Sequence, residues 1–90
     1  MKVYIEFISW ASRKAGYSWI WLEVLDGTKL KDLIENVLPK VLSHEVAEAF
    51  IKSIKNGDIN VLINGRTVYD FEYVLNDGDK VYLLPLAVGG

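Results

Sequence analysis

Apolar and polar side chains alternate in two segments near the start of the sequence, residues 2–8 and residues 17–24. A period of two residues is typical of a β-strand that turns one face toward a core. β-branched and aromatic residues, which favour strands, dominate both segments. We therefore predict two strands that pair as a hairpin. The charged stretch between them, residues 11–16, ends in glycine and is expected to form a turn or loop.

The same alternation divides the side chains of these strands between two faces. The face toward the helices is predicted to hold Val3, Ile5, Phe7, Ile20 and Leu22. The opposite face is predicted to hold an aromatic group that residues of later strands would extend, namely Tyr4, Trp19, Trp21, Leu62, Tyr82 and Leu84. A large exposed apolar patch usually marks an interface, and Trp and Tyr are favoured hot-spot residues. The alternative is that a loop of the chain covers this patch.

A helical spacing follows the two strands. Five apolar residues recur on one predicted helix face, namely Leu30, Leu33, Ile34, Val37 and Leu38. Thr28 is the predicted N-cap, because its hydroxyl can accept a hydrogen bond from the first turn. Pro39 is expected to end this helix near Leu38, because proline disfavours helical geometry in the residue before it.

A second helical pattern covers about residues 45–55, with Ser43 as its N-cap and Gly57 as a left-handed stop. Alternation then returns in residues 59–63. The pair Asn64–Gly65 predicts a tight hairpin turn, because both positions need a positive φ. The remaining elements are a short strand at 67–69, a turn at 75–79, and a last strand at 80–84 that Pro85 closes.

This order of elements predicts an α+β fold, with one mixed sheet of about five strands and one or two helices on one face. The crossover between the strand at 17–24 and the strand at 59–63 is long enough to place these strands parallel. A chain of 90 residues makes one domain. We assign residues 1–84 to this domain and residues 85–90 to a flexible C-terminal tail that ends in Gly-Gly.

Composition excludes several classes of function. The net charge is −2 without a basic cluster, which argues against a nucleic-acid partner. No apolar run reaches the roughly 20 residues that cross a membrane, so a cytoplasmic protein is expected. The chain has no cysteine, and its one histidine, His44, is expected to be a solvated surface residue, so neither a zinc site nor a catalytic triad is predicted. Asp77 and Asp79 are interpreted as turn residues rather than calcium ligands.

The last six residues, PLAVGG, are apolar where a frayed terminus is usually polar. Glycine lacks a Cβ, so Gly-Gly can thread a narrow channel and adopt dihedral angles that other residues avoid. A terminal carboxylate that another protein's active site must reach has these requirements. The residues alone leave this reactive tail and an ordinary inert terminus equally open.

The stretch LINGRTVYDFEYVLNDGDKVYLLPLAVGG resembles the C-terminal third of the MoaD/ThiS family of ubiquitin-like sulfur carriers. The family's ending is matched at the right spacing by Leu75, Asp77, Gly78, Asp79, Val81, Pro85, Gly89 and Gly90. The strand–R-x-x-G–strand layout of the N-terminal half, with Arg13 and Gly16, is also similar. The resemblance covers nearly the whole chain and is strongest to the small subunits of molybdopterin synthase. One departure is Leu86, which replaces the usual second proline and puts in doubt which partner the tail serves.

The resemblance implies a β-grasp fold and a chemistry that resides at the C-terminus. It implies that an E1-like enzyme adenylates the Gly90 carboxylate with ATP, that a thiocarboxylate then forms, and that the large subunit of molybdopterin synthase receives the tail. The chain itself is expected to bind no cofactor or metal and not to be catalytic alone. The predicted partner-binding residues are Leu84, Pro85, Leu86, Ala87, Val88, Gly89, Trp19 and Trp21.

Three other functions remain open at this stage. Similar archaeal proteins are joined to lysines as ubiquitin is, and such a modifier needs the same adenylated glycine. A thiamine-pathway sulfur carrier is a second alternative, although that family is usually shorter and lacks much of the segment interpreted here as a second helix. A plain β-grasp binding domain with an inert tail is the third.

Overall fold

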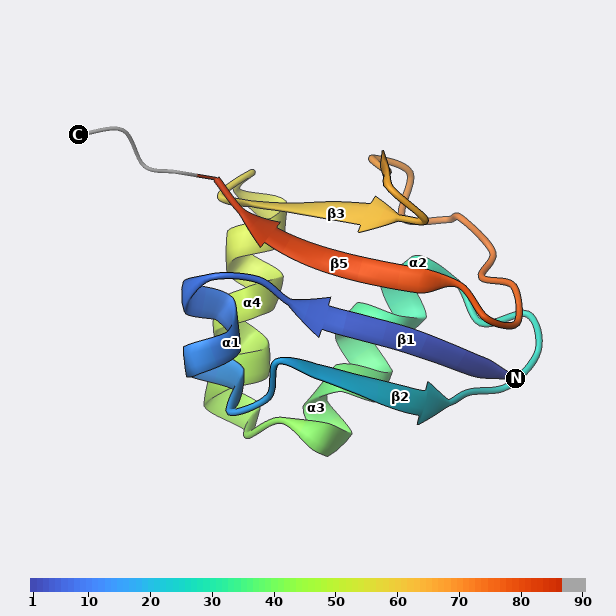
Figure 1. Ribbon diagram of the computed structural model, residues 1–90, viewed down its shortest axis with the longest axis horizontal. Coiled ribbons are helices and arrows are strands. Elements are labelled where there is room, and N and C mark those ends of the chain that lie inside the picture. Colours follow the sequence, from blue (N-terminus) through green and yellow to red (C-terminus); the bar gives the residue numbers. More distant parts are fainter. Residues whose placement is uncertain (87–90) are drawn as a thin grey trace.

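The computed structural model describes residues 1–86 and shows a mixed sheet with helices packed behind it (Figure 1). The five strands lie in the order β2-β1-β5-β3-β4. β1 and β5 are parallel, and the other neighbouring strands are antiparallel. The predicted α+β, β-grasp architecture is confirmed. The elements are β1 (Lys2–Phe7), α1 (Trp10–Ala15), β2 (Trp19–Glu23), α2 (Leu30–Asp32), the π-helix η1 (Leu33–Val37), α3 (Leu38–Val41), α4 (His44–Lys55), β3 (Ile59–Ile63), β4 (Arg66–Thr67) and β5 (Lys80–Pro85).

The alternation in β1 and β2 produces the predicted two-faced sheet. β1 pairs with β2 in antiparallel register, with Tyr4 opposite Trp21 and Glu6 opposite Trp19. The apolar residues predicted to face the helices are buried, apart from the half-buried Ile20 at the sheet edge. β2 and β3 run in the same direction, as predicted, but β1 and β5 separate them.

The prediction of a turn or loop at residues 11–16 was wrong, because a short helix, α1, connects the first two strands. Its Ala11 side chain is fully buried. Trp10 packs against Phe50 of α4, with ring centroids 6.3 Å apart. Gly16 ends the helix in the left-handed region at φ 80°, and its N–H donates to the Ser12 carbonyl. Burial of one apolar side of this segment therefore outweighs its polar composition.

The first predicted helix exists, but both of its predicted ends were wrong. It begins at Leu30, and the Thr28 hydroxyl donates to the Leu25 carbonyl at 2.6 Å instead of accepting from the helix. At the other end the chain continues past Pro39 to Val41. The wider π-helical turn of η1 precedes the proline, which lies in the first turn of α3, where its missing N–H costs little.

The second predicted helix is confirmed as α4. The Ser43 hydroxyl oxygen accepts a hydrogen bond from the Val46 N–H at 3.2 Å, and Gly57 adopts a φ of 83° beyond the helix end. Ala47, Phe50 and Ile54 are buried against the sheet. Among the helices of residues 1–86, none is long and apolar enough to cross a membrane.

The two predicted turns are also confirmed. Asn64 and Gly65 have φ values of 52° and 86°, which the tight turn between β3 and β4 requires. β4 covers Arg66–Thr67 rather than residues 67–69, and Tyr69 is 81% exposed beyond it. The Asp77 carboxylate accepts from the Lys2 N–H at 2.8 Å, so the turn before β5 is fixed to the start of β1.

Candidate functional site: the base of the tail and the outer face of the sheet

β5 carries the base of the predicted tail. Pro85 is buried and pairs with Ile59 of β3, at the end of the sheet where β1 also ends (Figure 1). One residue further, the Leu86 N–H donates to the Asp58 carbonyl at 3.0 Å, and the Leu86 side chain is 46% exposed. The remaining predicted residues of the tail, Ala87, Val88, Gly89 and Gly90, lie outside the described residues.

The hydrogen bond of Leu86 gives a reason for the departure from the family ending. A proline at this position would have no N–H to donate to Asp58. The leucine extends the attachment of the chain to the start of β3 by one residue beyond the last strand pair. The chain is therefore held in place up to residue 86.

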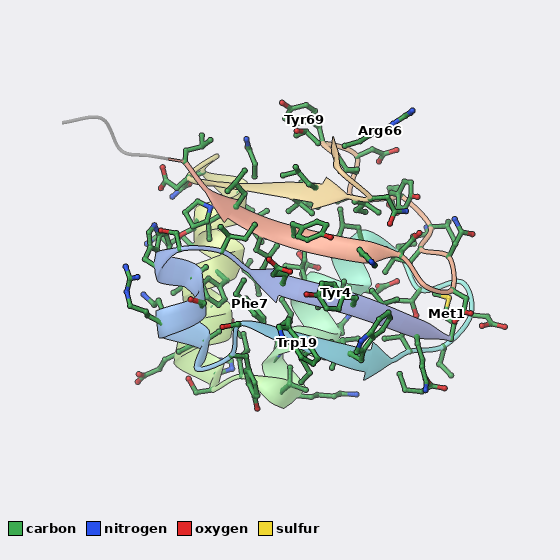
Figure 2. All side chains as sticks on the ribbon, in the orientation of Figure 1. Met1, Tyr4, Phe7, Trp19, Arg66 and Tyr69 are labelled. Atoms are coloured by element: carbon green, nitrogen blue, oxygen red, sulfur yellow. The ribbon has the colours of Figure 1, made fainter. Side chains whose placement is uncertain are left out.

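The outer face of the sheet carries a cluster of four aromatic rings, Tyr4, Trp19, Trp21 and Tyr82, which we call the aromatic cluster. Tyr4 lies at its centre, with ring centroids 6.0 Å from Trp19, 5.2 Å from Trp21 and 6.2 Å from Tyr82. Trp19 and Trp21 are 56% and 47% exposed, so no segment in residues 1–86 covers them. Figure 2 shows Tyr4 and Trp19 on the face of the sheet that the helices leave open.

The cluster continues as an apolar strip across the sheet. Leu62 lies beside Tyr82 in the register of β3 and β5, and Leu84 is two residues further along β5 on the same face. Both leucines are half-buried. The predicted exposed patch is present, and its Leu84 end lies next to the base of the tail. Trp10 is not part of it, because it lies on α1.

The sequence interpretation missed Glu6, the carboxylate within this patch. The Tyr4 hydroxyl donates to Glu6 Oε1 at 2.6 Å. This hydrogen bond is the main reason that the pKa of Tyr4 is raised to about 12. Partial burial and the negative charge of Glu6 are lesser causes that act in the same direction. The signal was present in the sequence, since Glu6 follows Tyr4 by two positions in a strand and shares its face.

Other candidate chemistry is not assembled in the described part of the chain. His44 is a surface residue, as predicted, with its Nε2 3.8 Å from the Glu48 carboxylate. Asp79 is buried within its turn and is hydrogen-bonded by Asn64 and by the Asn76 N–H. Within residues 1–86 no three His, Cys, Asp or Glu side chains gather as a metal site would require.

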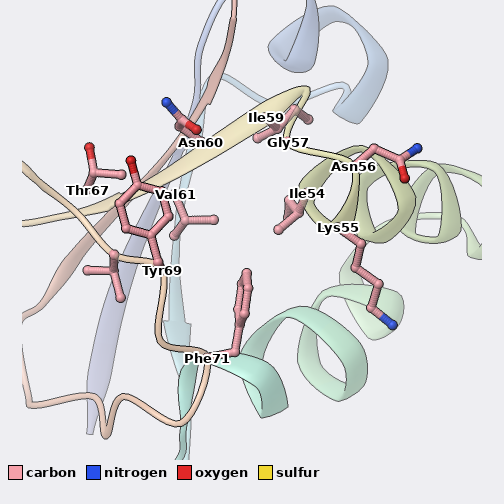
Figure 3. A pocket seen from close by; sticks show the side chains of 11 residues that line it. Ile54, Lys55, Asn56, Gly57, Ile59, Asn60, Val61, Thr67, Tyr69 and Phe71 are labelled. Carbon is pink, nitrogen blue, oxygen red and sulfur yellow. The ribbon is translucent and has the colours of Figure 1, made fainter.

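A groove of about 290 Å³ lies between the end of α4, β3 and the segment after β4 (Figure 3). Tyr69 and Phe71 line one side, and Ile54 and Lys55 line the other. Lys55 is the one charged side chain of this lining. The lining offers no carboxylate or histidine to pair with Lys55, and the outer face of the sheet remains the stronger candidate surface.

The mixed five-stranded sheet with helices on one face defines a ubiquitin-like β-grasp protein, and comparison with solved structures supports this class. The chain is 27% identical to molybdopterin converting factor subunit 1 from Pyrococcus furiosus, with a TM-score of 0.74 over 94% of this chain and 97% of that one. It is 25% identical to small archaeal modifier protein 1 from Methanosarcina acetivorans, with a TM-score of 0.73 over 99% and 96% of the two chains. No protein-family model and no curated protein matches the chain.

A third structure shows a protein of this fold with a partner. It is the complex of subunits 1 and 2 of the molybdopterin-converting factor from Helicobacter pylori, 19% identical, with a TM-score of 0.59 over the full length of both chains. At this identity the match shows the shared fold. The first two structures, at 27% and 25% identity, confirm the resemblance to MoaD/ThiS-like ubiquitin-like proteins that was found in the sequence.

Proposed function

We propose that the chain is a sulfur carrier, the small subunit of a molybdopterin synthase, and that Gly90 carries the sulfur. The position of β5 is the observation that supports this proposal most directly. β5 lies in the centre of the sheet, is paired up to Pro85, and leads into the Gly-Gly sequence. A domain that fixes the base of a short tail in this way can present the end of the tail to the active site of another protein.

The proposed chemistry takes place at the terminal carboxylate. An E1-like enzyme joins the Gly90 carboxylate to the AMP portion of ATP and releases pyrophosphate. A sulfur donor at the oxidation level of sulfide then displaces AMP and leaves a thiocarboxylate. In the large subunit this sulfur bonds to the precursor of the molybdopterin dithiolene, and water cleaves the bond between the sulfur and the Gly90 acyl carbon, which restores the Gly90 carboxylate. No side chain of the domain is needed for these steps, which is consistent with the absence of cysteine from the sequence.

The proposed contacts with both partners are made by the tail and the outer face of the sheet. Leu84 and Leu86 lie at the base of the tail, and Trp19 and Trp21 form the exposed edge of the aromatic cluster. Exposed Trp side chains on a flat apolar face supply a large contact area at an interface. The pairing of subunits 1 and 2 in the Helicobacter pylori structure supports a large-subunit partner.

The intact mass of the protein, purified from its own host, tests the proposal. A mass increase equal to the replacement of one oxygen by sulfur, located in the C-terminal peptide, is expected. The Gly90→Ala variant should lose this increase and keep the urea unfolding curve of the unchanged protein. Sulfur transfer that persists without Gly90, or a carboxylate that stays unmodified with ATP and an E1-like enzyme, would overturn the proposal.

A protein modifier is the second candidate, and the similarity to small archaeal modifier protein 1 supports it. It requires the same adenylated carboxylate but a lysine amine as the acceptor. The same experiment separates the two functions. Gly90 found in isopeptide linkage to lysines of other proteins would favour the modifier, whereas sulfur at Gly90 without such conjugates would favour the carrier.

A further inference from the structure

Glu6 lies inside the aromatic cluster. The strand registers place it directly beside Trp19 on β2 and beside Tyr82 on β5. The Phe7 N–H donates to the Ser18 carbonyl, so the neighbouring pair of Glu6 and Trp19 is a non-hydrogen-bonded pair of the ladder. Side chains approach more closely at such pairs. The carboxylate therefore has aromatic neighbours on both sides.

The carboxylate of Glu6 has unused capacity as an acceptor. A carboxylate can accept about four hydrogen bonds, and in the described part of the chain a side-chain hydrogen bond reaches it from the Tyr4 hydroxyl. Lys80 is on the same face and is paired with Tyr4 in the register of β1 and β5. Across residues 1–86, no ion pair within 4.0 Å involves Glu6.

We propose that this site binds an arginine side chain of the partner protein, with the guanidinium on the Glu6 carboxylate and in contact with the neighbouring rings of Trp19 and Tyr82. A cation is favoured twice here, by the negative charge and by the electron-rich ring faces. Guanidinium is favoured over ammonium because it is planar, stacks on aromatic rings and pairs with a carboxylate through two parallel hydrogen bonds. Such a contact would neutralise Glu6 when the apolar strip is buried at an interface.

The openness of the site favours a side chain of another protein over a free small molecule. Trp19 and Trp21 are about half exposed, so the rings form an open face and not an enclosed cage. A free cation would leave much of its surface in water on such a face and bind only weakly, whereas a partner surface would cover the same cation and bind it more tightly. The carboxylate also disfavours a nucleic acid, because it would repel phosphate groups next to any stacked base.

This inference rests on the proposed function in one respect: the arginine is assigned to the protein that receives the tail. The site itself can be tested without that protein. N-acetyl-arginine amide is titrated into the full chain, and the indole N–H signals of Trp19 and Trp21 are followed by NMR. N-acetyl-citrulline amide, which has the same shape but no charge, is the matched probe. We expect saturable shifts with the arginine derivative and roughly tenfold weaker binding of the citrulline derivative.

Two variants complete the test. Glu6→Gln keeps an acceptor on the same strand face and should weaken binding of the arginine derivative by roughly tenfold. Glu45→Gln removes the same charge from the exposed first turn of α4 and should leave binding unchanged. Equal shifts with both probes, or equal binding by the Glu6→Gln variant, would overturn the site. Neither result depends on Gly90, so a failed sulfur-transfer test and a failed arginine test remain distinguishable.

Discussion

The side chain of Asn64, in the tight turn between β3 and β4, is hydrogen-bonded to Asp79 and Lys80 at the turn that precedes β5. Its Nδ2 donates to Asp79 Oδ1 at 2.9 Å, and its Oδ1 accepts from the Lys80 N–H at 3.0 Å. Asp79 is 6% exposed, and its second oxygen accepts from the Asn76 N–H at 2.8 Å. The family motif residue Asp79 thus fixes the start of β5, the strand that carries the tail.

The bond between Asn64 and Asp79 predicts a large effect of Asp79→Ala on stability. This change leaves the Asn64 amide and the Asn76 N–H without their acceptor, and we expect a loss of about 2–3 kcal/mol in the free energy of unfolding. Urea unfolding measures it. Asp70→Ala is the matched control, because Asp70 accepts from the Glu72 N–H at an exposed site and should cost less. Equal losses for the two variants would contradict the structural role assigned to Asp79.

Ser9 predicts a stabilising substitution. It precedes α1 with φ 57° and ψ −134°, a conformation that suits glycine, and its hydroxyl makes no capping hydrogen bond. Ser9→Gly should therefore raise the free energy of unfolding by about 1 kcal/mol, after the larger entropy of glycine in the unfolded chain is deducted. Thermal or urea unfolding measures the change.

Ser43 provides the opposite case for the same substitution. It precedes α4 with φ −63°, and its hydroxyl accepts from the Val46 N–H. Ser43→Gly should lower the free energy of unfolding by a few tenths of 1 kcal/mol, roughly the usual cost of glycine at an N-cap. If both variants changed stability in the same direction, the strain assigned to Ser9 would be wrong.

Sequence periodicity predicted the strands and their buried faces correctly where burial alone determines the pattern. The period of two in β1 and β2 depends on burial alone, and it predicted correctly both the buried Val3 and Ile5 and the exposed Trp19. It failed where tertiary packing overrode a local rule. Leu38 stays helical before Pro39 because its side chain is almost completely buried, and the π-helical turn accommodates the proline.

The candidate site was predictable in its apolar part and not in its polar part. The exposure of Trp19 and Trp21 follows from the alternation of a single strand. The place of Glu6 between Trp19 and Tyr82 depends on the pairing of β1 with both β2 and β5, and neither register is encoded in one segment. The donor role of the Leu86 N–H likewise depends on the distant start of β3.

The hydrogen bond between Tyr4 and Glu6 predicts an unusual ionisation. That bond, with partial burial and the charges of Glu6 and Tyr82, raises the pKa of Tyr4 from 10.0 to about 12. A raised pKa means that the folded state favours the neutral phenol of Tyr4 more than the unfolded state does. The resulting contribution to the free energy of unfolding is complete below about pH 10 and is lost as the pH rises toward about 12.

An absorbance titration of tyrosinate, compared between the unchanged protein and Tyr4→Phe, measures this pKa. Glu6→Gln should lower the pKa of Tyr4, because the variant removes the negative charge and offers a weaker acceptor. Tyr82→Phe, which changes a lesser cause, should lower it less. A Tyr4 that titrates at its usual pKa in the unchanged protein would show that the hydrogen bond to Glu6 does not form in solution.

Leu86→Pro restores the family's second proline and tests why this chain departs from it. Proline removes the N–H that donates to the Asp58 carbonyl at 3.0 Å, so we expect the free energy of unfolding to fall by about 0.5–1.5 kcal/mol. Leu86→Ala keeps the donor and removes only a half-exposed side chain, so it is the matched control and should cost less. Urea unfolding measures the stability of both variants.

Hydrogen exchange provides a local readout of the same change. In the proline variant the start of β3 loses part of its attachment, so we expect faster exchange at Ile59 and Asn60. If the proline variant were as stable and as protected as the alanine variant, the leucine would have to be explained by the partner of the tail and not by the fold.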